Sequence, residues 1–183
     1  MFKAALLLAC VVTVYAAPTT SQACSDVTVI FARGTSEAAP IGSVVGPPFQ
    51  TALRTALGSR SLSFQGVNYA ATVGGFLMGG DRVGAATMAQ NVASTATSCP
   101  NTKIVMSGYS QGGQLVHLAA QQLTPSVQAR VNAIVIFGDP DNGQPFPGNL
   151  NAVEKTFCAV GDLICTGTSI VLPAHLSYGQ ASQ

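Results

Sequence analysis

Residues 103 to 123 read KIVMSGYSQGGQLVHLAAQQL, an apolar run that leads through Gly-Tyr-Ser-Gln-Gly at 108–112 into a helix-like segment. A G-x-S-x-G motif between a strand and a helix is typical of a nucleophile elbow, a strained turn flanked by glycines that lack a clashing Cβ atom. We therefore expect Ser110 to be a nucleophile and the backbone N–H of Gln111 to stabilise an oxyanion. The alternative is a chance motif in a chain with 19 glycines, in which Ser110 only caps the helix.

Outward from this motif, short apolar runs alternate with longer helix-like stretches, an order typical of a parallel sheet covered by helices on both faces. The expected strands are 27–32, 62–69, 103–108, 133–138 and 155–160. The expected helices are 44–57, 82–97 and 111–123, with Pro125 ending the third. The sequence thus predicts one α/β domain, a three-layer sandwich around a central, mainly parallel five-stranded sheet.

The first 16 residues, MFKAALLLACVVTVYA, place one lysine before an apolar run that ends in small residues. This layout is typical of a cleavable secretory signal, whereas a membrane span needs about 20 apolar residues. We expect cleavage after Ala16 and a single mature domain over 17–183. The protein is accordingly expected to be secreted, monomeric and free of an integral membrane anchor.

Cleavage would remove Lys3 and leave seven basic residues against seven acidic ones. A neutral chain is not expected to bind nucleic acid or an acidic membrane surface.

Cleavage would also remove Cys10 and leave four cysteines, an even number that suggests two disulfides in an exported protein. Of the three possible pairings we favour Cys158 with Cys165 and Cys24 with Cys99, although spacing alone leaves the pairing open. A zinc site is the alternative, but C-x6-C without a nearby histidine pair does not match metal-ligand spacing. We expect neither a metal nor a cofactor.

A nucleophilic serine needs a base, and the base needs an orienting carboxylate. The chain has two histidines. His117 lies seven residues after Ser110 on the same expected helix, about two turns from the elbow, and is expected to be structural. His175 follows an apolar run in a loop late in the chain, where it can approach Ser110 across the edge of the sheet. We therefore expect His175 to be the base.

Five aspartates are candidates for the carboxylate that orients the base: Asp26, Asp81, Asp139, Asp141 and Asp162. The chain order serine, acid, histidine excludes the first two. Asp139 and Asp141 lie in Gly-Asp-Pro-Asp-Asn, which reads equally well as a turn. Asp162 lies between Cys158 and Cys165, in a loop that a local disulfide would stiffen, and we favour it as the acid.

The chain resembles the family of fungal cutinases and acetylxylan esterases over nearly all of its expected mature length. The matching segments are FARGTSE at 31–37, Cys-Pro at 99–100, GYSQG at 108–112, C-x3-GD-x2-C at 158–165 and PAHLSY at 173–178. This resemblance implies an α/β-hydrolase fold with little or no lid, the two disulfides named above, and a triad of Ser110, Asp162 and His175. It also implies that Thr35 joins Gln111 in the oxyanion hole. Phe76 stands about where many cutinases carry an asparagine that supports this hole.

Three functions are consistent with these residues. The favoured one is a cutinase that hydrolyses cutin and other aliphatic esters through an acyl-enzyme, because apolar residues are expected near the rim of the site: Phe76, Leu77, Met78, Ile170, Val171, Leu172 and Leu176. The second is an acetylxylan esterase with the same machinery in a more polar cleft. The third is a secreted binding protein that keeps the fold without turnover.

Overall fold

A computed structural model of the protein describes residues 24–180, and the expected signal segment at 1–16 lies outside them. Within the described residues the chain forms one five-stranded sheet in the order β2-β1-β3-β4-β5, and every strand pair is parallel. The strands are β1 (Val27–Ala32), β2 (Leu62–Gly66), β3 (Lys103–Tyr109), β4 (Val131–Phe137) and β5 (Glu154–Phe157). The predicted sheet is therefore confirmed, and it is entirely parallel.

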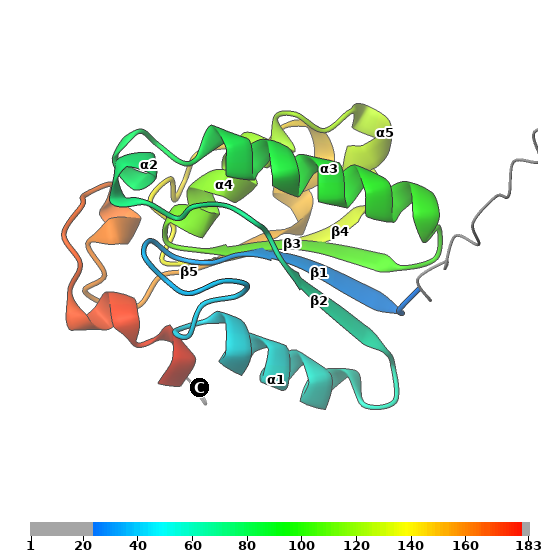
Figure 1. Ribbon diagram of the computed structural model, residues 1–183, viewed down its shortest axis with the longest axis horizontal. Helices are drawn as coiled ribbons and strands as arrows, with labels where there is room; N and C mark the ends of the chain where they lie inside the picture. The colour runs from blue at the N-terminus through cyan, green and yellow to red at the C-terminus, as the bar shows by residue number, and fades with distance from the viewer. Residues whose placement is uncertain (1–23, 181–183) are drawn as a thin grey trace, which may run out of the picture.

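Helices cover both faces of the sheet (Figure 1). One face packs on α1 (Gly46–Leu57), and the other on α3 (Arg82–Ser98) and α4 (Gln111–Ala120). Successive residues of a strand point to opposite faces, so Phe31 of β1 joins the cluster beneath α1 and Ile30 joins the cluster beneath α3 and α4. The molecule is the three-layer sandwich that the sequence predicts.

Parallel strands end at one edge of the sheet, and the segments that follow them gather there. They include α2 (Val73–Leu77) and the 3₁₀ helices η2 (Ile164–Thr166), η3 (Pro173–Leu176) and η4 (Tyr178–Gln180). Figure 1 shows η3 and α2 at this edge, with η4 beside the start of α1. A fourth 3₁₀ helix, η1 (Gly148–Val153), precedes β5.

Several boundaries differ from the predicted ones. Helix α4 ends at Ala120, three residues early, and Pro125 does not end it but begins a separate short helix, α5 (Pro125–Gln128). Thr124 caps α5 by accepting the N–H of Val127, and proline is well suited to a first helical turn. Helix α2 was not predicted, because its glycines have low helix propensity; the Thr72 hydroxyl caps it by accepting the N–H of Gly75. Strands β2 and β5 each end three residues before the predicted ends.

Both expected disulfides are present. Cys24–Cys99 joins the segment before β1 to the end of α3, and Cys158–Cys165 closes the loop that follows β5. Among residues 24–180, no helix has the length and apolar character needed to cross a membrane.

Candidate active site

Ser110 occupies a sharp turn between β3 and α4, with φ 55° and ψ −122°. The neighbouring glycines are required by backbone packing. A Cβ atom on Gly108 would lie 2.2 Å from the carbonyl oxygen of Gly112, and one on Gly112 would lie 2.0 Å from that of Ala32. These contacts are too short for any side chain, so the turn has the geometry of a nucleophile elbow.

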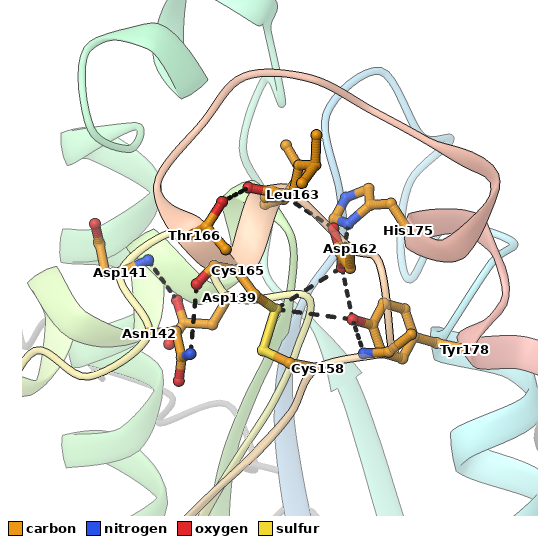
Figure 2. The surroundings of a disulfide bond; sticks show 12 residues. Asp139, Asp141, Asn142, Cys158, Asp162, Leu163, Cys165, Thr166, His175 and Tyr178 are labelled. Atoms are coloured by element: carbon orange, nitrogen blue, oxygen red, sulfur yellow. Dashed lines mark hydrogen bonds and ion pairs between the residues drawn. A yellow bond between two sulfur atoms is a disulfide. The ribbon is translucent and has the colours of Figure 1, made fainter.

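Asp162 and His175 form a buried pair at the same edge of the sheet. Oδ2 of Asp162 lies 2.8 Å from Nδ1 of His175, and the two residues are 4% and 2% exposed. The other carboxylate oxygen, Oδ1, accepts the N–H of Ile164 at 3.0 Å. Figure 2 shows the carboxylate between the Cys158–Cys165 loop and the imidazole. Because an ionised carboxylate can only accept, Nδ1 carries the proton and Nε2 is left as the basic nitrogen.

Tyr109 contacts both the imidazole ring and the backbone of His175. It stacks on His175 with centroids 5.0 Å apart, and its hydroxyl donates to the His175 backbone carbonyl at 2.8 Å. Burial raises the pKa of Tyr109 above its ordinary value, so the phenol remains a donor at neutral pH.

Hydrogen bonds between side chains and the backbone hold the segment that carries Thr35. The Glu37 carboxylate accepts N–H groups from Gly34 at 2.7 Å and from Ser43 and Val44 at 2.9 Å each. Arg33 Nε donates to the Glu37 carbonyl at 2.7 Å. Thr35 is thereby fixed between two anchored residues, beside the pocket that contains Ser110.

The side chain of Gln111 connects the elbow to two neighbouring segments. Its Nε2 donates to the Thr72 carbonyl at 2.6 Å and to the Thr35 hydroxyl at 3.3 Å, and the residue is fully buried. A hydroxyl that accepts at its oxygen keeps its proton for another partner. Thr35 can therefore donate into the pocket. The backbone N–H of Gln111 stands at the start of α4, where the helix itself provides no acceptor.

A pocket of about 400 Å³ opens above these groups. Its polar lining consists of Thr35, Glu37, Tyr109, Ser110, Ser169 and His175. Its apolar wall consists of Val44, Val73, Phe76, Leu77, Ile164, Val171 and Leu176. Of the seven predicted rim residues, four line this pocket: Phe76, Leu77, Val171 and Leu176. The others, Met78, Ile170 and Leu172, are exposed outside it, at 80%, 53% and 38%.

His117 and Asp139 form a second buried pair, separate from the pocket. His117 Nε2 lies 2.9 Å from Asp139 Oδ2, and the imidazole stacks on Phe146 with centroids 4.2 Å apart. Asp139 Oδ1 also accepts the N–H of Asp141 at 3.0 Å. This arrangement agrees with the structural role expected for His117, while Asp139 proves to be a buried partner of His117 as well as a turn residue.

Three residues with clear positions in the site had no predicted role: Tyr109, Glu37 and Tyr178. Glu37 and Tyr178 both lie in segments that carry the family resemblance. The Glu37 carboxylate accepts N–H groups three to seven positions away, whereas the Tyr178 hydroxyl contacts Asp162, 16 positions away. An acidic residue two positions after the expected oxyanion residue was the one local signal for Glu37. Nothing local pointed to Tyr178.

Comparison with known proteins gives a consistent result. The family model described as Cutinase matches residues 23–183. The chain is 57% identical to a cutinase of Botryotinia fuckeliana over 91% of this chain and 84% of that protein, and 54% identical to a cutinase of Monilinia fructicola over 90% and 83%. Among solved structures, Trichoderma reesei cutinase in complex with a C11Y4 phosphonate inhibitor is similar, with 46% identity, a TM-score of 0.81, and coverage of 86% of this chain and 71% of that one.

Proposed function

This chain belongs to the cutinase family, and on that premise we propose that it is a secreted serine esterase acting on cutin and other aliphatic esters. The observation that carries the proposal is the buried 2.8 Å contact between Asp162 and His175, at a pocket that also contains the strained Ser110. A serine hydroxyl, an imidazole and a carboxylate in this arrangement are the groups that acyl transfer requires.

In the proposed reaction the Ser110 hydroxyl attacks the ester carbonyl while Nε2 of His175 accepts its proton. Asp162 holds Nδ1 and stabilises the imidazolium. The imidazolium then gives its proton to the departing alcohol, and an acyl-serine remains. Water, deprotonated by His175, releases the acid and restores Ser110.

The oxyanion of each tetrahedral intermediate is proposed to bind at the backbone N–H groups of Thr35 and Gln111 and at the Thr35 hydroxyl. The rigid segment around Glu37 and the amide of Gln111 support this role, because they fix the donors before substrate arrives. Donors that need no reorganisation are the most effective ones in catalysis.

The apolar wall of the pocket supports an aliphatic acyl group as the substrate. Side chains such as Phe76, Leu77 and Val171 would be covered by an acyl chain, and each buried CH₂ contributes about 0.8 kcal/mol. An acetyl group on a polar polysaccharide would cover little of this wall, so we place acetylxylan second.

We further propose that residues 1–16 are removed on export and that 17–183 act as one monomeric domain. The two disulfides support an oxidising destination, since such bonds persist outside the reducing cytosol.

The test is to express the full chain in a secreting host, sequence the amino terminus of the product, and measure hydrolysis of p-nitrophenyl butyrate, p-nitrophenyl palmitate, emulsified cutin and acetylated xylan. A serine-directed organophosphate and a Ser110→Ala variant are the controls. We expect cutin and butyrate activity that the organophosphate abolishes and that Ser110→Ala lacks while remaining folded. Dominant activity on acetylated xylan would move the function to the second candidate. A folded wild type with neither turnover nor labelling would overturn the proposal in favour of a binding protein.

A further inference from the structure

The carboxylate of Asp162 has a third donor besides His175 and the Ile164 N–H. The hydroxyl of Tyr178 lies 2.6 Å from Asp162 Oδ2, the same oxygen that accepts from His175 Nδ1 at 2.8 Å. In Figure 2 the phenol and the imidazole approach this oxygen from different directions. Two donors therefore share one carboxylate oxygen.

The direction of the Tyr178 hydrogen bond is fixed by its other partner. The backbone N–H of Ala159 donates to the Tyr178 oxygen at 2.8 Å. Since that oxygen accepts from Ala159, and since an ionised carboxylate has no proton to give, the phenolic proton lies toward Asp162. Ala159 and Asp162 both belong to the loop that Cys158–Cys165 closes, so this loop supplies the acceptor as well as the group that orients its donor.

Resting on the function proposed above, we propose that Tyr178 is a positioning residue that sets the pH range over which His175 acts as a base. A donor on Oδ2 disperses the negative charge that Asp162 presents to the imidazole. The protonated imidazole is then stabilised less, and neutral His175, the form that can accept the serine proton, persists to lower pH. Removing the hydroxyl concentrates the charge on the contact with His175.

Among residues 24–180, the other ionisable side chains near Asp162 and His175 have different partners and do not donate to the Asp162 carboxylate. Tyr109 of β3 donates to the backbone carbonyl of His175. Glu37 of the loop after β1 lines the pocket, and its carboxylate accepts three backbone N–H groups. Lys155 of β5 lies over the ring of Phe157, 5.7 Å from its centroid. Beyond β4, Asp139 is occupied by His117.

Tyr178 remains a protonated donor at neutral pH and below. Burial raises the pKa of Tyr178 above its ordinary value, and the hydrogen bond to Asp162 acts in the same direction. The phenol is thus a constant donor to the carboxylate that contacts His175.

The experiment is the pH profile of kcat/KM for wild type and Tyr178→Phe on p-nitrophenyl butyrate. The variant keeps the ring, which packs edge-on against Phe137 at 6.0 Å, and removes only the hydroxyl. We expect the acid limb to move upward by about half a pH unit. We also expect plateau kcat to fall about 3- to 10-fold, because Asp162 loses one anchor, while KM stays nearly constant.

Tyr109→Phe is the matched control, since it removes a phenolic hydroxyl that contacts the backbone of His175 and not the carboxylate. It should lower kcat without moving the acid limb. A merely structural role for Tyr178 would give this same pattern, or a downward shift as the contact between Asp162 and His175 weakens. Either result in a folded Tyr178→Phe protein overturns the proposal.

Two further measurements keep the test decisive. Imidazole NMR titration of the resting protein needs no turnover: the midpoint of His175 should rise in Tyr178→Phe, while His117 serves as an unshifted reference in the same spectrum.

If Tyr178→Phe does not fold, 3-fluorotyrosine at position 178, a stronger donor of nearly the same shape, should move the acid limb downward, and an unmoved limb contradicts the proposal. An inactive, unlabelled wild type would refute the esterase assignment alone, because the NMR comparison would still report on Tyr178.

Discussion

Gly138 lies directly against the imidazole of His175. A Cβ atom at this position would stand 2.7 Å from Cε1 and 2.8 Å from Nδ1 of His175, and 3.0 Å from Oδ2 of Asp162. The residue follows the last residue of β4 and has φ +57°, in the left-handed region that favours glycine. The carboxyl end of β4 thus packs directly against the side chains of Asp162 and His175.

Replacing Gly138 by alanine should therefore impair catalysis as well as stability. The methyl group must displace the imidazole or the carboxylate, and a misplacement of about 1 Å can cost about 100-fold in rate. We expect kcat/KM on p-nitrophenyl butyrate to fall about 10- to 100-fold in Gly138→Ala. Gly143→Ala is the matched control, because Gly143 also has a positive φ, +89°, but a Cβ there meets nothing within 4 Å. It should lose some thermal stability and keep its activity; equal loss of activity in both variants would contradict the contact-based explanation.

Exchange of the Gln111 amide for a carboxylate should disable the proposed oxyanion hole. In Gln111→Glu the backbone N–H is unchanged, but the donor that faces the Thr72 carbonyl and the Thr35 hydroxyl becomes an acceptor. The Thr35 proton would then turn toward the new carboxylate and away from the pocket. Loss of one oxyanion donor typically costs 100- to 1000-fold, so we expect kcat to fall by about two orders of magnitude.

The control for this substitution is Gln114→Glu one turn later on α4. Gln114 Nε2 donates to the Phe76 carbonyl at 3.3 Å, and within residues 24–180 no hydrogen bond joins it to Thr35. We expect its kcat to stay within about threefold of wild type, as its bond supports only α2. The comparison requires steady-state kinetics and a melting curve for each variant. A Gln111→Glu enzyme as active as Gln114→Glu would show that the Gln111 amide is not needed to orient the Thr35 hydroxyl.

The predictable parts of this molecule are those whose cause is local. The strand, turn and helix around Ser110 follow from an apolar run and two glycines, and β1 has the predicted boundaries. The predicted end of α4 was wrong and α5 was not predicted, because Pro125 can begin a helix as readily as stop one. The capping Thr124 decides between the two outcomes. Tyr178 could not be assigned, since its bonds to Ala159 and Asp162 exist only after β5, the disulfide loop and η4 have packed together.

Removal of each disulfide should affect stability and activity differently. Cys24–Cys99 spans 75 residues and Cys158–Cys165 spans 7. In the chain-entropy model, loss of the long loop costs about 4–5 kcal/mol and loss of the short loop about 2–3 kcal/mol. The short loop, however, carries Asp162 and the N–H that orients Tyr178, so its loss should also reduce kcat.

Serine pairs at each disulfide provide the measurement. The double variant of Cys24 and Cys99 should have the lower melting temperature but nearly normal kcat below its transition. The double variant of Cys158 and Cys165 should melt at a higher temperature than the other double variant. Its kcat should nevertheless be at least about tenfold below that of wild type. The reverse ranking of activities would show that the short disulfide does not hold the acid in place.

Two aspartates should give stability an opposite dependence on pH. Burial raises the pKa of Asp141 above its ordinary value; His117 opposes this shift and Asp139 adds to it. Because the folded protein binds this proton more tightly than the unfolded chain, the stabilisation is present at low pH and is lost as pH rises through the folded value. Asp26 is the converse: hydrogen bonds from the Ser61 side chain and backbone lower its pKa, so its contribution is present at neutral pH and is lost on acidification.

Melting temperatures of Asp141→Asn and Asp26→Asn between pH 3 and pH 8 test these signs. At pH 7 the ionised Asp141 is poorly solvated, so its replacement by a neutral isostere should raise the melting temperature by about 1–2 °C. The gain should vanish toward pH 3, where wild type is itself protonated. Asp26→Asn should be less stable than wild type at pH 7, because an amide accepts hydrogen bonds more weakly than a carboxylate, and should converge with wild type at low pH. Stabilisation by Asp141→Asn that persists unchanged at pH 3 would mean that packing, and not the charge of a half-buried carboxylate, accounts for the effect.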